Sequence, residues 1–264
     1  MKIGFIGAGN MAEAIICGLL RAKAAKPSEI FINDIAKPRI DILKKRYKVV
    51  PVVSNNAIVS DSDVIIIAVK PKDAKSILEC LGNIKKGSFI ISIMAGVTTG
   101  FFSKSGKKLP VVRVMPNTPA LVLSGITGIC KGKYANKTNL QKAKNILSSV
   151  GKVVEVNEKL MDAVTSVSGS GPAYVFLFAE ALIEAAKKAG LDKTSAKILV
   201  SNTLLGGARM ILDSKDEPSV LREKVTSPGG TTAAALEVFE NLKFKEIVGK
   251  AVQAAKKRSK AMSK

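Results

Sequence analysis

The most constraining feature of this sequence is a series of short aliphatic stretches within its first 156 residues. These stretches are continuous rather than alternating with polar residues, which is typical of strands buried on both faces. They occupy residues 2–7, 29–34, 64–69, 89–94, 110–115 and 152–156. The intervening segments, such as 10–23, 38–46 and 72–81, have the pattern of helices. Alternating strands and helices predict a parallel, doubly wound α/β sheet.

From about residue 159 the pattern becomes helical throughout. The stretch 170–190 has a proline just inside its start and a glycine after its Lys-Lys end, which are the usual boundary signals of a helix. Residues 192–214 predict a second long helix, and shorter helices are expected at 218–226, 230–240 and 243–262. We therefore expect an α/β domain over residues 1–158 and an all-helical domain over residues 159–264.

The charge and cysteine content limit the class of partner. The net charge is +21, but the basic residues are spread along the chain and aromatic residues make up only 5%. Without clusters of basic and aromatic residues, we expect no nucleic-acid partner. Cys17, Cys80 and Cys130 form no C-x-x-C pair and lie in apolar contexts, which indicates a reducing compartment.

No apolar run is expected to reach the length that spans a membrane, and the N-terminus lacks a signal-peptide pattern. A soluble cytoplasmic protein without a membrane partner is therefore predicted. The chain contains no histidine. This excludes serine–histidine triads, histidine acid–base steps and most zinc sites, so no metal is expected.

The segment "GFIGAGNMAEAI" at 4–15 contains the pattern G-x-G-x-x-A at the point where a strand passes into a helix. Gly7 permits the tight turn, Gly9 lets the backbone approach a pyrophosphate, and Ala12 lets the helix pack against the strand. A tight turn without a ligand is the alternative, which the position at the start of a strand–helix alternation disfavours. The predicted loop is completed by Ala8, Asn10 and Met11, and it makes the first domain a Rossmann-type dinucleotide-binding domain.

The end of the second strand bears on the choice of cofactor. Asp34 follows Asn33 about twenty residues after the glycine motif, where an acid binds the ribose 2′-hydroxyl of NAD. Lys37 and Arg39 come shortly afterwards and are able to meet a 2′-phosphate. Both NADH and NADPH therefore remain open.

Three further strand ends lie where ligands bind in open α/β sheets. The turns Ala68-Val69-Lys70-Pro71 and Ala95-Gly96 are expected to border the nicotinamide half of the cofactor. Lys70 is either a ligand of ribose or substrate carboxylate, or a solvated lysine. The turn with Asn117 and Thr118 is either a wall of the site or a stiff connection.

The stretch "VTSPGGTTAAALEVFE" at 225–240 joins a glycine-containing loop to a helix of small residues. A helix start preceded by glycines presents free N–H groups to a carboxylate, and Pro228 stiffens the loop. The alternative is an ordinary helix cap. Ser168 and Ser170 in "SVSGSGPAY" either complete a substrate pocket or cap the following helix.

Taken in order, "GFIGAGNMAEAI", "SDVIIIAVKP", "RVMPNTPA", "SGSGPAY" and "VTSPGGTTAAALEVFE" resemble pyrroline-5-carboxylate reductases over essentially the whole chain. The last motif is specific to that family and the first is generic. The resemblance implies reduction of 1-pyrroline-5-carboxylate to L-proline by NADPH or NADH. It also implies that the helical domain is a dimerisation domain, with homodimers that assemble further, for example into a decamer.

The resemblance also implies roles for individual residues. Asn55 would contact the adenosine part of the cofactor, while Ala68, Lys70 and Ala95 would border the nicotinamide and its ribose. The substrate carboxylate would be held by Ser227, Gly229, Gly230 and Thr231. Thr232 would bind the ring nitrogen and is the expected catalytic residue. Asn33-Asp34 departs from the small or polar residues that usually precede a 2′-phosphate, which argues against a strict NADPH preference.

Two other classes of protein share some of these sequence features. A β-hydroxyacid dehydrogenase has the same two-domain plan with a catalytic lysine on its interdomain helix, but Lys187 and Lys188 lie near the end of the helix and outside any such motif. A non-catalytic nucleotide- or nucleic-acid-binding protein is suggested only by the charge.

Overall fold

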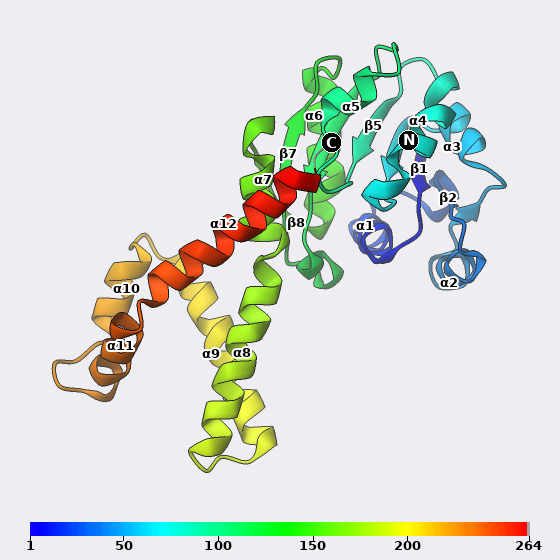
Figure 1. The fold of residues 1–264 in the computed structure, drawn as a ribbon. Coiled ribbons are helices and arrows are strands. Elements are labelled where there is room, and N and C mark those ends of the chain that lie inside the picture. The colour runs from blue at the N-terminus through cyan, green and yellow to red at the C-terminus, as the bar shows by residue number, and fades with distance from the viewer. Residues whose placement is uncertain (263–264) are drawn as a thin grey trace. The chain divides into compact units, whose positions relative to one another are not determined.

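The computed structural model describes residues 1–262, apart from the side chain of Asn83. They form two compact units (Figure 1). Unit 1 comprises Met1–Pro172 together with the described residues from Ala254 onward, and unit 2 comprises Ala173–Gln253. The domain boundary expected between residues 158 and 159 stays a prediction, and residues 263–264 of that predicted domain lie outside the described residues.

Unit 1 contains a single sheet with the strand order β3-β2-β1-β4-β5-β6-β7-β8. All neighbouring strands are parallel except β6 and β7, which are antiparallel. The strands are β1 (Ile3–Ile6), β2 (Ile30–Asn33), β3 (Val50–Pro51), β4 (Val64–Ile67), β5 (Phe89–Ser92), β6 (Val111–Met115), β7 (Gly125–Lys131) and β8 (Gly151–Glu155). The predicted doubly wound sheet is thus confirmed, with β7 and β8 running opposite to the other six strands.

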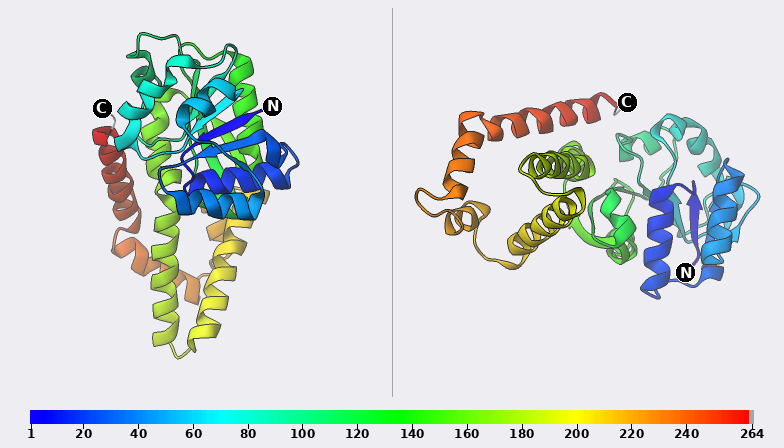
Figure 2. Two further views of the ribbon diagram at one scale, coloured as in Figure 1. Left: turned by 90° about the vertical axis from the view of Figure 1, so that its right-hand side faces the viewer. Right: turned by 90° about the horizontal axis from the view of Figure 1, so that it is seen from below.

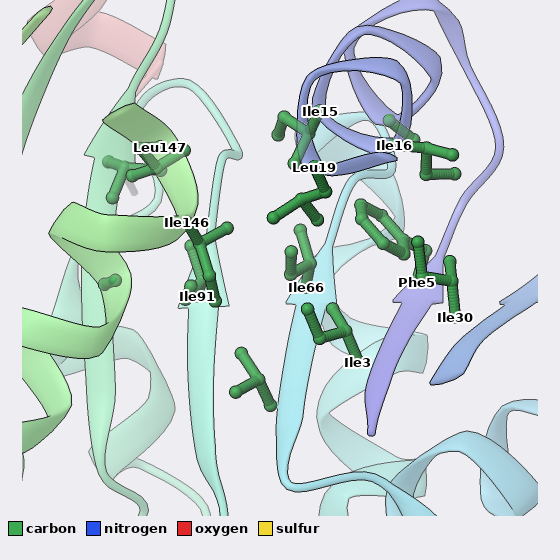
Figure 3. Packing of buried hydrophobic residues seen from close by; sticks show 14 of the residues in the cluster. Ile3, Phe5, Ile15, Ile16, Leu19, Ile30, Ile66, Ile91, Ile146 and Leu147 are labelled. Atoms are coloured by element: carbon green, nitrogen blue, oxygen red, sulfur yellow. The ribbon is translucent and has the colours of Figure 1, made fainter. Parts of the chain in front are cut away.

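Helices cover both faces of this sheet. They are α1 (Asn10–Arg21), α2 (Lys37–Tyr47), α3 (Asn55–Asp61), α4 (Ala74–Cys80), α5 (Thr99–Ser103) and α6 (Lys137–Leu147). On one face, Ile15 and Leu19 of α1 and Ile146 of α6 pack on strand residues such as Phe5 (Figure 3). On the other face, Ile58 of α3, Ile77 of α4 and Phe102 of α5 join a second apolar cluster. Every residue of β1, β4 and β5 is buried, as the continuous aliphatic runs require.

Strand β7 is the main element that the sequence pattern missed. Its sequence GITGICK contains two glycines, which weaken a strand signal. Gly128 is required by packing, because a Cβ there would lie 2.6 Å from Val164 Cγ1. Gly128 is therefore needed for the close approach of Val164, and its low β propensity explains why the sequence pattern did not predict this strand.

Unit 2 is helical, and no strand follows β8 in the part of the chain that the structure describes. In Figure 2, α8 and α9 form a hairpin whose turn lies at residues 189–192. The helices that lie wholly or partly in this unit are α8 (Gly171–Lys188), α9 (Lys193–Asp213), α10 (Pro218–Lys224), α11 (Thr231–Asn241) and α12 (Phe244–Met262). No residue of α8 is buried, and Val175, Phe176 and Leu177 are more than half exposed, at 51%, 66% and 66%.

Ser168 and Ser170 lie where the chain passes from α7 toward α8. The short helix α7 (Met161–Val164) passes through a π-helical turn at Thr165–Gly169 directly into α8. Ser168 Oγ donates to Val164 O in the preceding turn at 2.9 Å. Ser168 is therefore not a cap, because a serine inside a helix bonds back to its own chain. Ser170 directly precedes α8, and both roles predicted for it stay open.

The same continuity corrects the expectation about membrane-spanning runs. The helical stretch Glu158–Lys188 is long and apolar enough to cross a membrane by length and composition. The sequence pattern predicted a helix only over 170–190, whereas the helical stretch already begins at Glu158. Length and composition are equally typical of a helix that another protein surface covers.

Candidate nucleotide and carboxylate sites

The turn between β1 and α1 has the geometry of a dinucleotide-binding loop. Gly7 has a φ of +102°, and a Cβ there would lie 2.6 Å from Ala68 O. Its N–H donates to Asn33 O at 2.8 Å, so the turn is attached to β2. Gly9 is different, because no atom lies within 4 Å of the position that its Cβ would take. Gly7 thus serves a tight turn, and Gly9 leaves room for a ligand.

The N-terminus of α1 fits the pyrophosphate that this loop would hold. Gly9 is the N-cap residue and no side chain caps the helix. Among the described residues, the N–H groups of Asn10 and Met11 have no hydrogen-bond acceptor. Free N–H groups at the positive end of a helix dipole bind a phosphate group.

Asp34 lies beside this loop, and both of its carboxylate oxygens accept backbone N–H groups. Oδ2 accepts from Ala8 N at 2.6 Å and Oδ1 from Ala36 N at 2.7 Å. Asn33 Nδ2 donates to Asn55 Oδ1 at 2.8 Å, which joins the end of β2 to the start of α3. The structure therefore brings Asn33, Asp34 and Asn55 together at the edge where the sequence predicted the adenosine ribose.

The two basic residues that follow Asp34 differ in their surroundings. Arg39 Nε donates to Ala8 O at 2.9 Å, and its Nη2 pairs with Glu13 Oε2 at 2.7 Å. Lys37 is exposed, and no described residue forms an ion pair with it. The Arg39 side chain thus binds the glycine loop and Glu13. The sequence had suggested a 2′-phosphate ligand at this position and gave no sign of these contacts.

Glu13 is the buried centre of this network. Arg46 Nη1 and Tyr47 Oη also donate to its carboxylate, at 2.6 and 3.2 Å. Burial raises the pKa of Glu13, but its hydrogen bonds and the charges of Arg39 and Arg46 outweigh this and leave the pKa below its ordinary value. The only sequence signal for this residue was an acid on the otherwise apolar face of α1.

The ends of β4 and β5 form the next part of this edge. Ala68 N donates to Ile6 O at 2.8 Å, so Ala68 and Val69 continue beside the glycine loop. Lys70 is exposed and precedes a short 3-10 turn that starts at Pro71. No described residue pairs with the Lys70 ammonium, so both of its predicted roles remain open.

Ala95 and Gly96 lie in the turn after β5, beside the last turns of α12. Gly96 has a φ of +76°, and a Cβ there would lie 3.2 Å from the backbone of Met262. A cavity of about 150 Å³ lies between this turn, the π-helical turn and α12. It is lined by Ala95, Gly96, Thr165, Ser170, Ala255, Arg258, Ser259 and Met262.

Glu158 holds the start of α5, which follows this turn. Glu158 accepts hydrogen bonds from Thr99 N and Thr99 Oγ1 at 2.7 and 2.6 Å, and it lies 3.5 Å from the buried Arg113. Cys130 lies near Glu158 and Arg113, and burial raises the pKa of its thiol to about 12. Cys130 is therefore no thiolate nucleophile near neutral pH.

Asn117 belongs to a stiff connection. It is buried, and its Oδ1 accepts a hydrogen bond from Ile126 N at 3.0 Å, which ties the turn after β6 to β7. Thr118 is exposed at the start of a 3-10 turn. Of the two roles left open for this turn, the contacts favour the structural one.

Unit 2 contains the loop predicted to bind a carboxylate. Gly229 has a φ of +69°, and Gly230 is the N-cap residue of α11 with no side-chain cap. Gly230 N donates to Ser227 O at 3.0 Å, which closes the loop. Among the described residues, no acceptor is bonded to the N–H of Thr231 or Thr232. An ordinary side-chain cap is thus absent, and the helix start is available to an anion.

Known proteins show the same organisation. Residues 2–96 match the family model described as NADP oxidoreductase coenzyme F420-dependent, and residues 158–262 match the model described as pyrroline-5-carboxylate reductase dimerisation. Together with the glycine loop, the first match defines the chain as an enzyme of the nicotinamide-dependent oxidoreductase class.

The most similar relatives narrow this class. Pyrroline-5-carboxylate reductase 2 of Bacillus subtilis is 41% identical over 98% of this chain and 94% of its own length. The pyrroline-5-carboxylate reductase of Synechocystis is 42% identical over 100% and 99%. The chain belongs to the pyrroline-5-carboxylate reductase family. The alternatives of a β-hydroxyacid dehydrogenase and of a non-catalytic binding protein are therefore wrong.

Solved structures of the family agree in fold. A pyrroline-5-carboxylate reductase from Coxiella burnetii is 39% identical with a TM-score of 0.92, covering 100% of this chain and 98% of its own. A pyrroline carboxylate reductase from Plasmodium falciparum with NADP bound is 36% identical with a TM-score of 0.91, with the same coverage of both chains. The match of residues 158–262 to a dimerisation domain supports a homodimer.

Proposed function

We propose that this protein reduces the C=N bond of 1-pyrroline-5-carboxylate to give L-proline, as the last step of proline supply. The observation that carries the assignment to particular residues is the uncapped start of α11 behind a Ser-Pro-Gly-Gly loop. NADPH or NADH supplies a hydride to the ring carbon when bound. The protein chain itself binds the substrate and the cofactor, aligns them and supplies hydrogen bonds.

In this proposal the substrate carboxylate is held by the loop of unit 2. Ser227, Gly229, Gly230 and Thr231 surround the helix start, and the free N–H groups there stabilise a negative charge. The positive φ of Gly229 and the absence of side chains at both glycines keep the backbone accessible. The carboxylate thereby fixes the orientation of the ring.

Thr232 is proposed as the catalytic residue. Its side chain is half-buried on the first turn of α11, one residue beyond the proposed carboxylate ligands. A hydride on carbon leaves an electron pair on the ring nitrogen, which needs a proton or a hydrogen-bond donor. Because the sequence contains no histidine, the nitrogen either arrives protonated, as the iminium, or arrives as the neutral imine. In the second case it accepts a hydrogen bond from the Thr232 hydroxyl and takes its proton from water.

The cofactor is proposed to lie along the carboxyl edge of the sheet in unit 1. The uncapped start of α1 and the open position at Gly9 support a pyrophosphate there. Asn33, Asp34 and Asn55 surround the adenosine end. The turns containing Ala68, Val69, Lys70 and Pro71, and containing Ala95 and Gly96, border the nicotinamide end.

We also propose that residues 1–158 bind the dinucleotide, while residues 159–264 bind substrate and form the dimer. A larger assembly such as a decamer is proposed on top of the dimer, and light scattering tests it. A cytoplasmic location is supported by three free cysteines, none of them in a disulfide among the described residues.

The decisive experiment measures oxidation of NADH and of NADPH in the presence of 1-pyrroline-5-carboxylate, with proline as the product. We expect substrate-dependent oxidation of at least one cofactor. A crystal structure with substrate bound tests the residue assignments, and a carboxylate found far from residues 227–232 in every pairing of subunits would refute them.

A further inference from the structure

The backbone of Ala8, in the middle of the glycine loop, is held on both sides by residues of one neighbouring segment. Its N–H donates to Asp34 Oδ2 at 2.6 Å, and its carbonyl accepts from Arg39 Nε at 2.9 Å. Asp34 follows β2, and Arg39 lies in the first turn of α2. Two peptide units of the loop are thereby fixed in direction.

The direction of the Ala8 carbonyl decides where the next N–H points. In a trans peptide the C=O and N–H groups are antiparallel, and the described chain has no cis peptide bond. Because Arg39 holds Ala8 O on the side of α2, the Gly9 N–H points away from α2. Among the described residues no acceptor is bonded to that N–H, and the space beside Gly9 is open.

Arg39 is itself held in place by Glu13. The carboxylate of Glu13 is only 12% exposed, and it lies 2.7 Å from Arg39 Nη2. Glu13 N in turn donates to Gly9 O at 3.0 Å. The four residues Ala8, Gly9, Glu13 and Arg39 therefore form a closed ring of hydrogen bonds, in which the guanidinium cannot turn toward a ligand without leaving a buried carboxylate with fewer partners.

We propose that Arg39 is a positioning residue, which holds the Ala8–Gly9 peptide so that the Gly9 N–H faces the cofactor pyrophosphate. This inference rests on the proposed cofactor site. It assigns Arg39 to the part of the dinucleotide that NADH and NADPH share. Arg39 thus supports both cofactors equally and does not distinguish the 2′-phosphate from the 2′-hydroxyl.

The test measures dissociation constants of NADH and NADPH by nicotinamide fluorescence, with Arg39→Met in the full-length protein. Loss of a charged hydrogen bond to the loop is expected to weaken both cofactors by a similar factor, about tenfold or more. Lys37→Met is the matched control, because it removes a positive charge from the same end of α2 without touching Ala8. It should leave the dissociation constant of NADH unchanged.

Two outcomes would overturn the proposal. One is a loss confined to NADPH in Arg39→Met, which would make Arg39 a ligand of the 2′-phosphate. The other is a loss of NADH binding in Lys37→Met as large as that in Arg39→Met, which would show that any positive charge at this end of α2 has the same effect.

If Arg39→Met does not fold, Glu13→Gln and Arg39→Lys replace it. Both keep the size of the side chain and are expected to weaken the two cofactors by equal, smaller factors, whereas unequal factors would count against the proposal. Wild-type turnover of 1-pyrroline-5-carboxylate tests the proposed function separately, because cofactor binding is measured without substrate.

Discussion

Ser259 Oγ donates a hydrogen bond to Asp162 Oδ1 at 2.7 Å, across 97 residues of sequence. Ser259 is buried near the end of α12, and Asp162 lies in α7. The bond fixes the last turns of α12 in unit 1, where the Met262 backbone lies beside Gly96. The C-terminal turns of the chain thus help to shape the turn that is proposed to border the nicotinamide.

Replacing Ser259 by alanine should destabilise unit 1. A hydrogen bond to a charged acceptor contributes ~1.5–3 kcal/mol, and this is the expected loss in free energy of unfolding, measured by urea denaturation. Lys260→Ala is the control, since Lys260 is exposed on the same helix. Because alanine favours a helix more than serine or lysine does, an equal loss in both variants would show that the Ser259 hydrogen bond is not the cause.

The stability of unit 1 should depend on pH through Glu13. Because the pKa of Glu13 is lower in the folded protein than its ordinary value of 4.5, its contribution is fully present above that value and is lost as the pH falls through the folded pKa. We expect the difference in unfolding free energy between wild type and Glu13→Gln to be constant near neutral pH and to shrink in acid. A difference of the same size at about pH 3 as at neutral pH, where Glu13 is ionised, would contradict this.

Thr232→Val removes the proposed hydrogen-bond donor and keeps the shape of the side chain. Turnover should fall by about tenfold to a hundredfold, equivalent to ~1.5–3 kcal/mol, while the dissociation constants of the cofactors stay unchanged. Thr232→Ser retains the hydroxyl and should retain most of the rate. An unaltered kcat in the valine variant would remove Thr232 from the mechanism.

Asp34→Ser should shift the cofactor preference toward NADPH, because a negative charge near the 2′-phosphate is removed. The structure adds a second effect. Since Asp34 also accepts the Ala8 N–H, binding of NADH should weaken in the same variant. The ratio of the two dissociation constants, measured by fluorescence titration, checks both effects, and an unchanged ratio would mean that Asp34 does not face the ribose.

The sequence alone was sufficient to predict those strands and helices whose position depends only on their own residues. Strands β1, β4 and β5 are continuous aliphatic runs, and the observed ends fall within two residues of the predicted ones. Strand β7 was missed because it contains two glycines, of which Gly128 makes room for Val164 of α7. Helix α8 begins at Gly171, within one residue of the predicted start, but the π-helical turn before it was not predicted, because serines and glycines usually end a helix.

The candidate site divides in the same way. Gly7 and Gly9 were predictable because turn, strand and helix follow one another in the chain. The role of Arg39 was not, because it depends on α2 lying beside the first turn of α1, and no local pattern encodes that arrangement. Arg39 is 31 positions from Ala8 and 26 positions from Glu13 in the sequence, so these residues meet only after the sheet has formed.

Helix α8 has no buried residue, although its composition is strongly apolar. Phe176 and Phe178 are therefore uncovered in a single newly synthesised chain, and a homodimer interface over α8 would cover them. Assembly must compete with aggregation before such a dimer forms, and the balance depends on how many copies the cell makes at once. Slow or scarce synthesis would favour loss of the lone chain, so the amount of working enzyme should rise more steeply than the amount of protein produced.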